Sequence, residues 1–388
     1  MRIGIVAYWF NRGQGVVARQ LRSALDELGH ETFVLARPTR KTNIRPDRID
    51  REGVWAQDRV TGATDYLVPW TDYEAWVDST DPDLILFDQN YQFEEISRLR
   101  RSGIRTAGRF VWEHFSEEHV TPAGEAFDAI YSLTACERER YETMGIESPR
   151  VRWGCHPELL AAARSQAEAS AERVHDFPSS STQLTTFLFP GGFMSKRKPL
   201  AETIEAFRAA EGESLRLVLK AQVERQSKKV DRLARGGRRF GRRDSRIEVV
   251  TEDLPTDAYL RMLASADVCL APSRWEGLGL HLFEATALGV PIVTNDNPPM
   301  NEVVRDGVNG LLVPGVPDGT APRSGIPAFK PDVPSLTAAV ERLADEGLRA
   351  DLAAGARRRR EELSWETTRA DLVELINRVA PPAAEAPR

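Results

Sequence analysis

The sequence predicts an α/β protein made of two doubly wound, Rossmann-like domains. Two observations favour this class. Short apolar runs, such as residues 3–7 and 186–190, alternate with segments of helical apolar spacing, which is the pattern of strand–helix–strand units in a parallel sheet. The chain of 388 residues is also long enough for about two domains with cores of their own.

The division between the domains is predicted from a change in composition. Residues 157–183 begin with an alanine- and glutamate-rich helical piece and end in the polar run 175–181, which is typical of a linker. We therefore place a first domain at residues 1–156, a linker at 157–183 and a second domain at 184–364. A last amphipathic helix is expected at residues 365–380.

Composition narrows the classes of function. The formal net charge of −6 gives no reason to expect nucleic acid as a partner. Cys136, Cys155 and Cys269 lie far apart, so we expect core residues of a reduced, cytoplasmic protein rather than disulfides or metal ligands. The N-terminus lacks the features of a signal peptide, and no apolar run approaches the roughly 20 residues of a spanning helix. These features favour a soluble protein.

The first domain opens with a strand–helix–strand unit. We expect a strand at residues 3–7, a loop at 8–15, a helix at 16–28 and a second strand at 32–36. A crossover of this length implies parallel strands. Residues 38–70 are polar and interrupted by glycine, and we expect loops or hairpins there.

The segment from Gly13 to Ala18 matches the G-x-G-x-x-G/A fingerprint of dinucleotide-binding proteins. Bulky residues separate Gly13 from the first strand, and the second strand ends in Arg37 where the fingerprint has an acidic residue. We interpret Gly13 and Gly15 as part of a helix N-terminus that meets a diphosphate. A plain tight turn and a nicotinamide-dependent oxidoreductase remain the alternatives.

Two polar motifs lie beside strands of the first domain. Asp81 and Asp83 flank a proline directly before the strand at 84–87, where an entry turn is favoured over a metal site. His114 follows the strand at 106–112, and the carboxyl ends of parallel strands are where ligands meet an open sheet. A helix-capping histidine is the alternative for His114.

The second domain carries a glycine- and cation-rich loop between its first strand and helix. Gly192 follows the strand expected at 186–190, and the cluster Lys196, Arg197 and Lys198 comes before a helix at residues 200–210. Fixed backbone N–H groups together with compact positive charges are what a diphosphate requires. A solvated basic turn is the alternative.

A second loop of this domain places glycines before a helix. The strand at residues 266–273 leads to Glu276, Gly277, Leu278 and Gly279, and a helix is expected from Leu280 to the Gly289 region. The helix N-terminus offers unpaired N–H groups to an anion. Glu284 lies one turn inside this helix, on the face that points back toward the loop.

Glu276 and Glu284 enclose seven residues, and with the intervening Gly-Leu-Gly they resemble the Glu-x7-Glu signature of retaining family-4 glycosyltransferases. The segments 298–304 and 306–313 are also similar to that family. The resemblance covers nearly the whole chain and implies the GT-B fold, in which the two domains face each other across a cleft. It further implies that the first domain binds the acceptor, the second binds the donor, and the last helix returns to the first domain.

The resemblance assigns roles to individual residues. It implies that Glu276 contacts sugar hydroxyls, Glu284 grips the nucleotide ribose, and His114 lies beside the acceptor. The donor diphosphate would be held by Lys198, by the glycine loop of the first domain, and by the amides of Gly277, Leu278, Gly279 and Leu280. The sequence departs from the family at Phe193, where an arginine is usual, and Lys196 or Arg197 could supply the missing charge.

Residues 225–246 are strongly basic, with only Phe240 as an interleaved aromatic residue. A solvated helix and loop is favoured over peripheral attraction to an anionic acceptor or membrane surface.

The sequence therefore predicts a retaining glycosyltransferase that moves a sugar from a nucleotide-diphosphate sugar to a hydroxyl acceptor. We expect no cofactor and no required metal, because cations and helix ends neutralise the leaving group. Besides the oxidoreductase, a non-catalytic sugar-nucleotide-binding protein remains an alternative. No motif specifies the base, the sugar or the acceptor.

Overall fold

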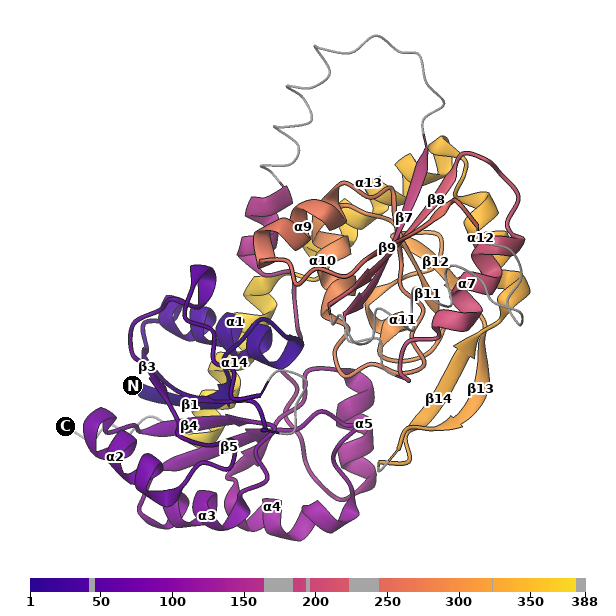
Figure 1. Ribbon diagram of the computed structural model, residues 1–388. Helices are drawn as coiled ribbons and strands as arrows, with labels where there is room; N and C mark the ends of the chain where they lie inside the picture. Colours follow the sequence, from indigo (N-terminus) through magenta and orange to yellow (C-terminus); the bar gives the residue numbers. More distant parts are fainter. Residues whose placement is uncertain (42–45, 164–183, 193–195, 223–243, 323, 382–388) are drawn as a thin grey trace, which may run out of the picture. The chain divides into compact units, whose positions relative to one another are not determined.

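The computed structural model describes residues 1–41, 46–163, 184–192, 196–222, 244–322 and 324–381 (Figure 1). The chain forms two compact units, of which unit 1 comprises Met1–Trp153 and Glu366–Arg388, and unit 2 comprises Gly154–Trp365. The first division falls next to the predicted domain end at residue 156. Most of the predicted linker, residues 164–183, lies outside the described part of the chain.

Unit 1 is built on a parallel sheet with the strand order β3-β2-β1-β4-β5-β6. Its strands are β1 (Arg2–Tyr8), β2 (Glu31–Arg37), β3 (Val60–Gly62), β4 (Leu84–Asp88), β5 (Arg105–Arg109) and β6 (Ala129–Ile130). Its helices are α1 (Gly13–Glu27), η1 (Gly53–Trp55), α2 (Trp70–Thr80), α3 (Phe93–Arg101), η2 (Glu117–His119), α4 (Val120–Ala126), α5 (Ala135–Thr143) and α14 (Trp365–Val379). Helices flank this sheet in Figure 1, so its central strands are buried, as their apolar sequences require.

Two details of unit 1 differ from the sequence-based expectation. Helix α1 begins at Gly13 rather than at residue 16, because the amide of Val16 already bonds the carbonyl of Arg12 at 2.8 Å. The region 38–70 forms no hairpin in its described part, since β3 pairs with β2 in parallel, with Val34 opposite Val60.

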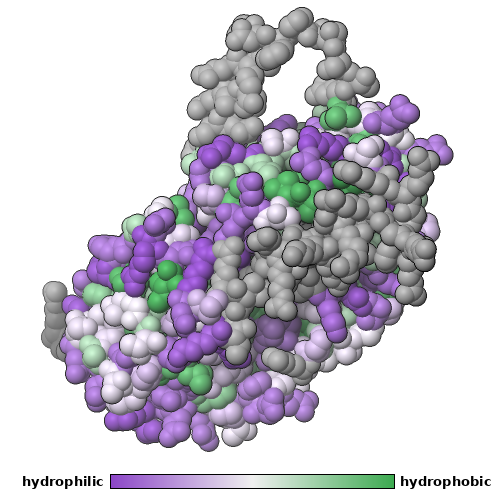
Figure 2. All heavy atoms as spheres, in the orientation of Figure 1, coloured by the Kyte–Doolittle hydropathy of each residue, from purple (hydrophilic) through white to green (hydrophobic). Residues whose placement is uncertain are grey.

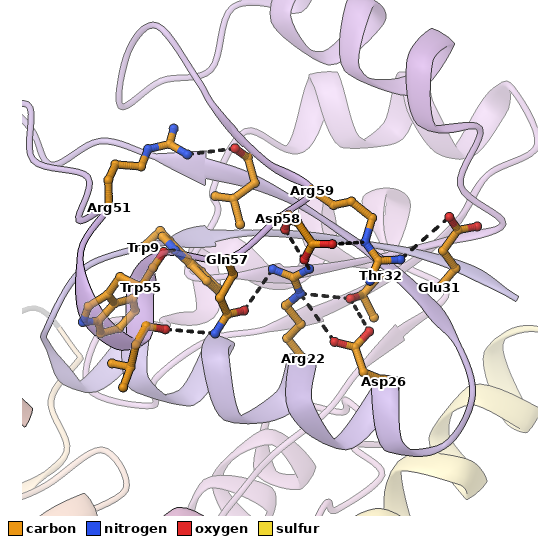
Figure 3. Close-up of polar contacts among 12 residues, drawn as sticks. Trp9, Arg22, Asp26, Glu31, Thr32, Arg51, Trp55, Gln57, Asp58 and Arg59 are labelled. Carbon is orange, nitrogen blue, oxygen red and sulfur yellow. Dashed lines mark hydrogen bonds and ion pairs between the residues drawn. The ribbon is translucent and has the colours of Figure 1, made fainter. Parts of the chain in front are cut away.

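A buried arginine of α1 fastens the segment between β2 and β3 (Figure 3). The guanidinium of Arg22 donates to Thr32 Oγ1 at 3.0 Å, to Gln57 Oε1 at 3.0 Å and to the carbonyl of Asp58 at 2.9 Å. Arg22 Nε also lies 3.7 Å from Asp26 Oδ2, on the same helix. Because every arm of this cation has a protein partner, Arg22 holds the fold together rather than binding a ligand.

Helix α14 belongs to unit 1 although it is the last element of the chain. Arg152 makes a bidentate ion pair with Asp371, with distances of 2.7 and 2.8 Å. The hydroxyl of Thr368 donates to the carbonyl of Arg152 at 2.8 Å. The apolar face of α14 is buried, which fixes the helix through packing as well as through the ion pair. Its buried apolar residues are Leu372, Leu375, Ile376 and Val379.

Unit 2 has the parallel strand order β12-β11-β10-β7-β8-β9 and a separate antiparallel pair, β13-β14. Its strands are β7 (Thr185–Gly192), β8 (Leu215–Ala221), β9 (Ile247–Val250), β10 (Val268–Leu270), β11 (Ile292–Asn295), β12 (Gly310–Val313), β13 (Gly315–Thr320) and β14 (Pro327–Pro331). Its helices are α7 (Leu200–Ala209), α9 (Thr256–Ala264), α10 (Leu280–Leu288), α11 (Met300–Val303), α12 (Val333–Arg342) and α13 (Glu346–Glu362). The predicted fold class, α/β with two doubly wound parallel sheets, is confirmed.

Both sheets contain a topological switch point, where the strand order reverses. In unit 1 it lies between β1 and β4, and in unit 2 it lies between β7 and β10, where Val268 pairs with Phe187. The loops that leave two such strands diverge, and ligands of open α/β sheets bind between them at the carboxyl ends.

The face of the molecule shown in Figure 2 is largely hydrophilic where it is described, with apolar residues gathered in small patches. In the described ranges no helix is long and apolar enough to cross a membrane. Cys136, Cys155 and Cys269 are free thiols and buried, as the sequence predicts for core residues.

Candidate functional site

The switch point of unit 2 brings together the two predicted loops of this domain. Lys198 lies in the loop after β7, and Glu276 lies in the loop after β10, 78 positions further along the chain. Since β7 and β10 are neighbours in the sheet, these loops begin side by side. The two residues therefore meet through topology rather than through sequence proximity.

The centre of the site is a buried ion pair. Lys198 Nζ donates to Glu276 Oε1 at 2.7 Å and to Ser273 Oγ at 2.9 Å, and the Ser273 hydroxyl donates to Glu276 Oε1 at 2.8 Å. Lys198 is 8% exposed and Glu276 is 4% exposed. The serine fixes both partners, so the carboxylate and the ammonium are held in one geometry.

A second cation adjoins this pair. Arg197 Nη1 lies 3.5 Å from Glu276 Oε2, while Lys196 is exposed to solvent. Burial alone would raise the pKa of Glu276, but the charges of Arg197 and Lys198 outweigh it and hold that pKa well below its usual range. Burial lowers the pKa of Lys198, and the charge of Glu276 opposes this shift. With two cations around one carboxylate, this group of three has a net positive charge.

The loop after Glu276 is shaped for a helix start. Gly279, with a φ of 77°, is in the left-handed region and precedes α10. The first turn of α10 contains no acidic side chain, and no side chain caps it. The amide of Leu282 donates to the carbonyl of Gly279 at 2.8 Å, and the positive dipole end of the helix is not compensated by an acidic side chain of its own first turn.

Glu284 lies on the same helix but has a different environment. Tyr259 of α9 donates its hydroxyl to Glu284 Oε2 at 3.1 Å. Burial raises the pKa of Glu284 to about 7, against the lowering effect of the tyrosine hydrogen bond. Glu276 is therefore ionised at neutral pH, whereas Glu284 exchanges a proton there.

His281 is a residue of this site that the sequence-based reasoning did not select. It occupies the first turn of α10, and its Nε2 atom is buried without a hydrogen-bond partner among the described residues. Burial and the charge of Lys198 lower the pKa of His281 to about 3, so its ring is neutral. Histidine at the second position of a helix that follows a glycine loop is the sequence signal that could have marked it.

The other predicted residues of the second domain are placed as follows. Gly192 ends β7 with a φ of 50°, a conformation that favours glycine. Gly277 and Leu278 are buried in the loop, and Leu280 opens α10. Phe193 and most of the basic stretch, residues 225–243, lie outside the described residues.

The predicted residues of the first domain lie in unit 1. Gly13 is exposed in the first turn of α1, whereas Gly15 is buried, and a Cβ atom there would lie 2.2 Å from the carbonyl oxygen of Phe10. Packing therefore accounts for Gly15. His114 follows β5, its side chain is 47% exposed, and its Nε2 lies 3.6 Å from Glu113 Oε1.

Unit 1 lacks the features of a dinucleotide site at the fingerprint segment. Both glycines are inside α1 rather than in a tight turn directly after β1. Arg37, which ends β2, is buried and donates to the carbonyls of Tyr66 and Gln89, so no acidic group stands there for a ribose. The geometry disfavours the oxidoreductase interpretation.

The Asp81–Asp83 motif forms a turn, as predicted. Asp81 ends α2 in the left-handed conformation, with a φ of 42°, and Asp83 Oδ2 accepts a hydrogen bond from the amide of Arg2 at 2.7 Å. Within the described ranges, no group of three or more His, Cys, Asp or Glu residues is arranged to hold a metal ion.

Comparison with known proteins identifies the domain that carries this site. The family "Glycosyl transferases group 1" matches residues 185–323, which include β7, β10, α10 and the Lys198–Glu276 pair. Residues 185–323 form a group 1 glycosyltransferase domain. The predicted resemblance to glycosyltransferases is thereby confirmed for this domain.

A curated relative matches the same domain type. A D-inositol 3-phosphate glycosyltransferase from Acidothermus cellulolyticus is 32% identical over 115 residues, which are 30% of this chain and 22% of the relative. The match thus spans under a quarter of that relative's length.

Solved structures match almost the whole chain and support the fold class. Sucrose-phosphate synthase from Thermosynechococcus elongatus has a TM-score of 0.68 at 17% identity, covering 97% of this chain and 98% of its own. HepE from Anabaena, solved in complex with UDP and glucose, has a TM-score of 0.67 at 14% identity, covering 97% and 99%. At these identities the likeness concerns the fold: each unit has a doubly wound, Rossmann-like sheet of the kind found in GT-B glycosyltransferases.

Proposed function

We propose that this protein is a glycosyltransferase that moves a sugar from a nucleotide-diphosphate donor to a hydroxyl group of an acceptor, with retention of configuration and without a required metal. The observation that carries the proposal is the buried Lys198–Glu276 pair with Arg197 at the switch point of unit 2. A net positive group beside an uncapped helix start suits a diphosphate leaving group.

Each residue of the site has a role in this proposal. Lys198 and Arg197 neutralise the charge that develops on the leaving diphosphate, and the amides at the start of α10 donate hydrogen bonds to it. Arg197 supplies the second charge that the departure at Phe193 leaves open, because it contacts Glu276 while Lys196 points to solvent.

The two carboxylates divide the recognition of the donor. Glu276, ionised and fixed by Lys198 and Ser273, orients the sugar through its hydroxyls. Glu284 accepts hydrogen bonds from the ribose hydroxyls. The hydrogen bond from Tyr259 fixes the orientation of its carboxyl group for this role. In unit 1, exposed His114 contacts the acceptor.

Departure of the leaving group on the same face as the incoming hydroxyl accounts for retention. The leaving phosphate oxygen takes the proton of the acceptor hydroxyl as the new glycosidic bond forms and the bond to the diphosphate breaks. The protein then supplies positioning and charge stabilisation, and no protein nucleophile is needed.

A thermal-shift screen tests the donor site. The purified protein is heated with UDP, GDP, dTDP and ADP sugars, and with NAD and NADP as controls. Stabilisation by one class of sugar nucleotide, growing with its concentration, is the expected result. Stabilisation by a dinucleotide alone would overturn the proposal in favour of the oxidoreductase.

A turnover assay separates an enzyme from a sugar-nucleotide-binding protein. The stabilising donor is incubated with a panel of hydroxyl acceptors and with water alone, and release of nucleoside diphosphate is followed. We expect release that depends on Lys198 and Glu276. Tight binding of the donor without release under any condition would favour the non-catalytic alternative.

A further inference from the structure

Resting on the proposed function, the structure suggests one more residue for the donor site, His281. We propose that His281 is a positioning residue that donates a hydrogen bond from its ring to a phosphate oxygen of the nucleotide-diphosphate sugar.

The first observation is an unsatisfied polar atom. His281 Nε2 is buried and lacks a hydrogen-bond partner among the described residues. A buried ring nitrogen without a partner costs free energy, and a ligand oxygen that accepts its hydrogen bond would remove that cost. Here the partner can be a ligand, because the ring belongs to the first turn of α10 beside the glycine loop.

The second observation is the charge around the ring. The charged groups that interact with His281 are Lys198, Glu276 and Arg197, which come from the loops after β7 and β10. The net charge of these three groups is positive, which disfavours a further cation and favours an anionic group of a ligand. A neutral imidazole can donate a hydrogen bond there without adding charge repulsion.

The chemistry of the ligand follows from these two observations. An oxygen that accepts a hydrogen bond from the ring, and whose charge compensates Lys198 and Arg197, is an oxygen of a phosphate. Once such a group is bound, the imidazole faces an anion, and its affinity for a second proton rises. Donor binding should therefore be accompanied by proton uptake at mildly acidic pH.

Two substitutions test the hydrogen bond. His281→Leu removes the donor with little change in volume, and His281→Asn keeps an N–H donor that cannot be protonated. Titration calorimetry with UDP, GDP, ADP and dTDP identifies the one that binds the unaltered protein. We expect His281→Leu to weaken the affinity of the protein for this nucleotide by roughly ten- to a hundredfold. His281→Asn should have an affinity between those of His281→Leu and the unaltered protein. His30→Leu, at a turn in unit 1, is the matched control and should leave the affinity unchanged.

Proton linkage supplies a readout that a purely structural role would not change. Calorimetry at pH 5.5 in two buffers of different ionisation enthalpy should show proton uptake on nucleotide binding by the unaltered protein and less uptake by His281→Asn. Unchanged affinity and unchanged uptake in both variants would overturn the role of His281. Absence of binding by the unaltered protein would instead overturn the proposed function, and this inference with it.

Discussion

The two units have the same strand order around their switch points, yet they use the adjoining loops differently. In unit 1 the loop after β1 is filled by its own side chains and backbone. Trp9 and Phe10 are buried, and Gly15 packs against the backbone of Phe10. In unit 2 the loops after β7 and β10 carry a buried ion pair, and Gly279 turns the chain before α10. Glycine serves close packing in the first case and a left-handed turn in the second.

Buried carboxyl groups show the same contrast. Glu276 of unit 2 touches a lysine and an arginine, so its pKa is lowered. Glu137 of unit 1, in the first turn of α5, accepts the amide of Leu133 at 2.8 Å, and burial raises its pKa to about 7 although the charge of Arg109 opposes this. Direct contact with cations, rather than burial as such, decides which carboxyl group is ionised.

The largest expected effect follows from breaking the ion pair of unit 2. Lys198→Met leaves Glu276 buried without its nearest cation, which should cost about 3–5 kcal/mol of stability and lower turnover by roughly a hundredfold or more. Chemical denaturation and the release of nucleoside diphosphate measure the two effects.

The matched control for Lys198→Met is Arg216→Met, which breaks the exposed ion pair with Glu248 in the same unit. Its cost should be within about 1 kcal/mol, with turnover unchanged. Equal losses in both variants would show that burial of the pair has no special importance.

The next effect concerns pH. A carboxyl group whose pKa is raised in the folded state binds its proton more tightly than in the unfolded chain. Between pH about 4.5 and 7, Glu137 and Glu284 therefore lower the free energy of unfolding as pH rises, each by at most about 1.4 kcal/mol per pH unit.

Denaturation curves at pH 5, 6, 7 and 8 measure this slope. Glu137→Gln and Glu284→Gln should each flatten it, whereas Glu276, whose pKa is lowered, affects stability only as pH falls below its usual titration range. A slope that neither variant alters would contradict the raised pKa values.

Gly15→Ala tests the close packing in unit 1. Its Cβ would lie 2.2 Å from the Phe10 oxygen, a backbone atom, so the first turn of α1 must shift. We expect a loss of about 1–3 kcal/mol in the free energy of unfolding. Gly124→Ala, in α4 with open space around it, is the control and should be neutral or stabilising by about 0.5–1 kcal/mol.

The smallest expected effect distinguishes the two ends of α10. Gly279 precedes the helix and Gly289 ends it, and both have φ values near the left-handed region, 77° and 75°. Alanine at either site should cost roughly 1–2 kcal/mol of stability. Only Gly279→Ala should also weaken nucleotide affinity, which calorimetry measures, and equal affinities in both variants would argue against a ligand at the start of α10.

Much of the fold could be predicted from the sequence because it rests on local patterns. Apolar runs and helical spacing marked β1, β2, β7 and α10, since burial on both faces of a parallel sheet requires such runs. The start of α1 was wrong by three residues. The residues before residue 16 have the composition of a loop, so the helix was expected to begin after them. The sequence does not show that Gly15 packs against Phe10, which allows the helix to begin at Gly13.

The sequence by itself determined the fold class, the composition of the two loops that carry Lys198 and Glu276, and the helix that carries Glu284. Only the tertiary structure decided that Lys198 and Glu276 touch, that Arg197 rather than Lys196 adjoins them, and that His281 has a buried nitrogen without a partner. The physical reason is that contacts across a sheet depend on strand order, which joins residues about 80 positions apart. Protonation depends in turn on those contacts and on burial, and neither is written in the spacing of residues along the chain.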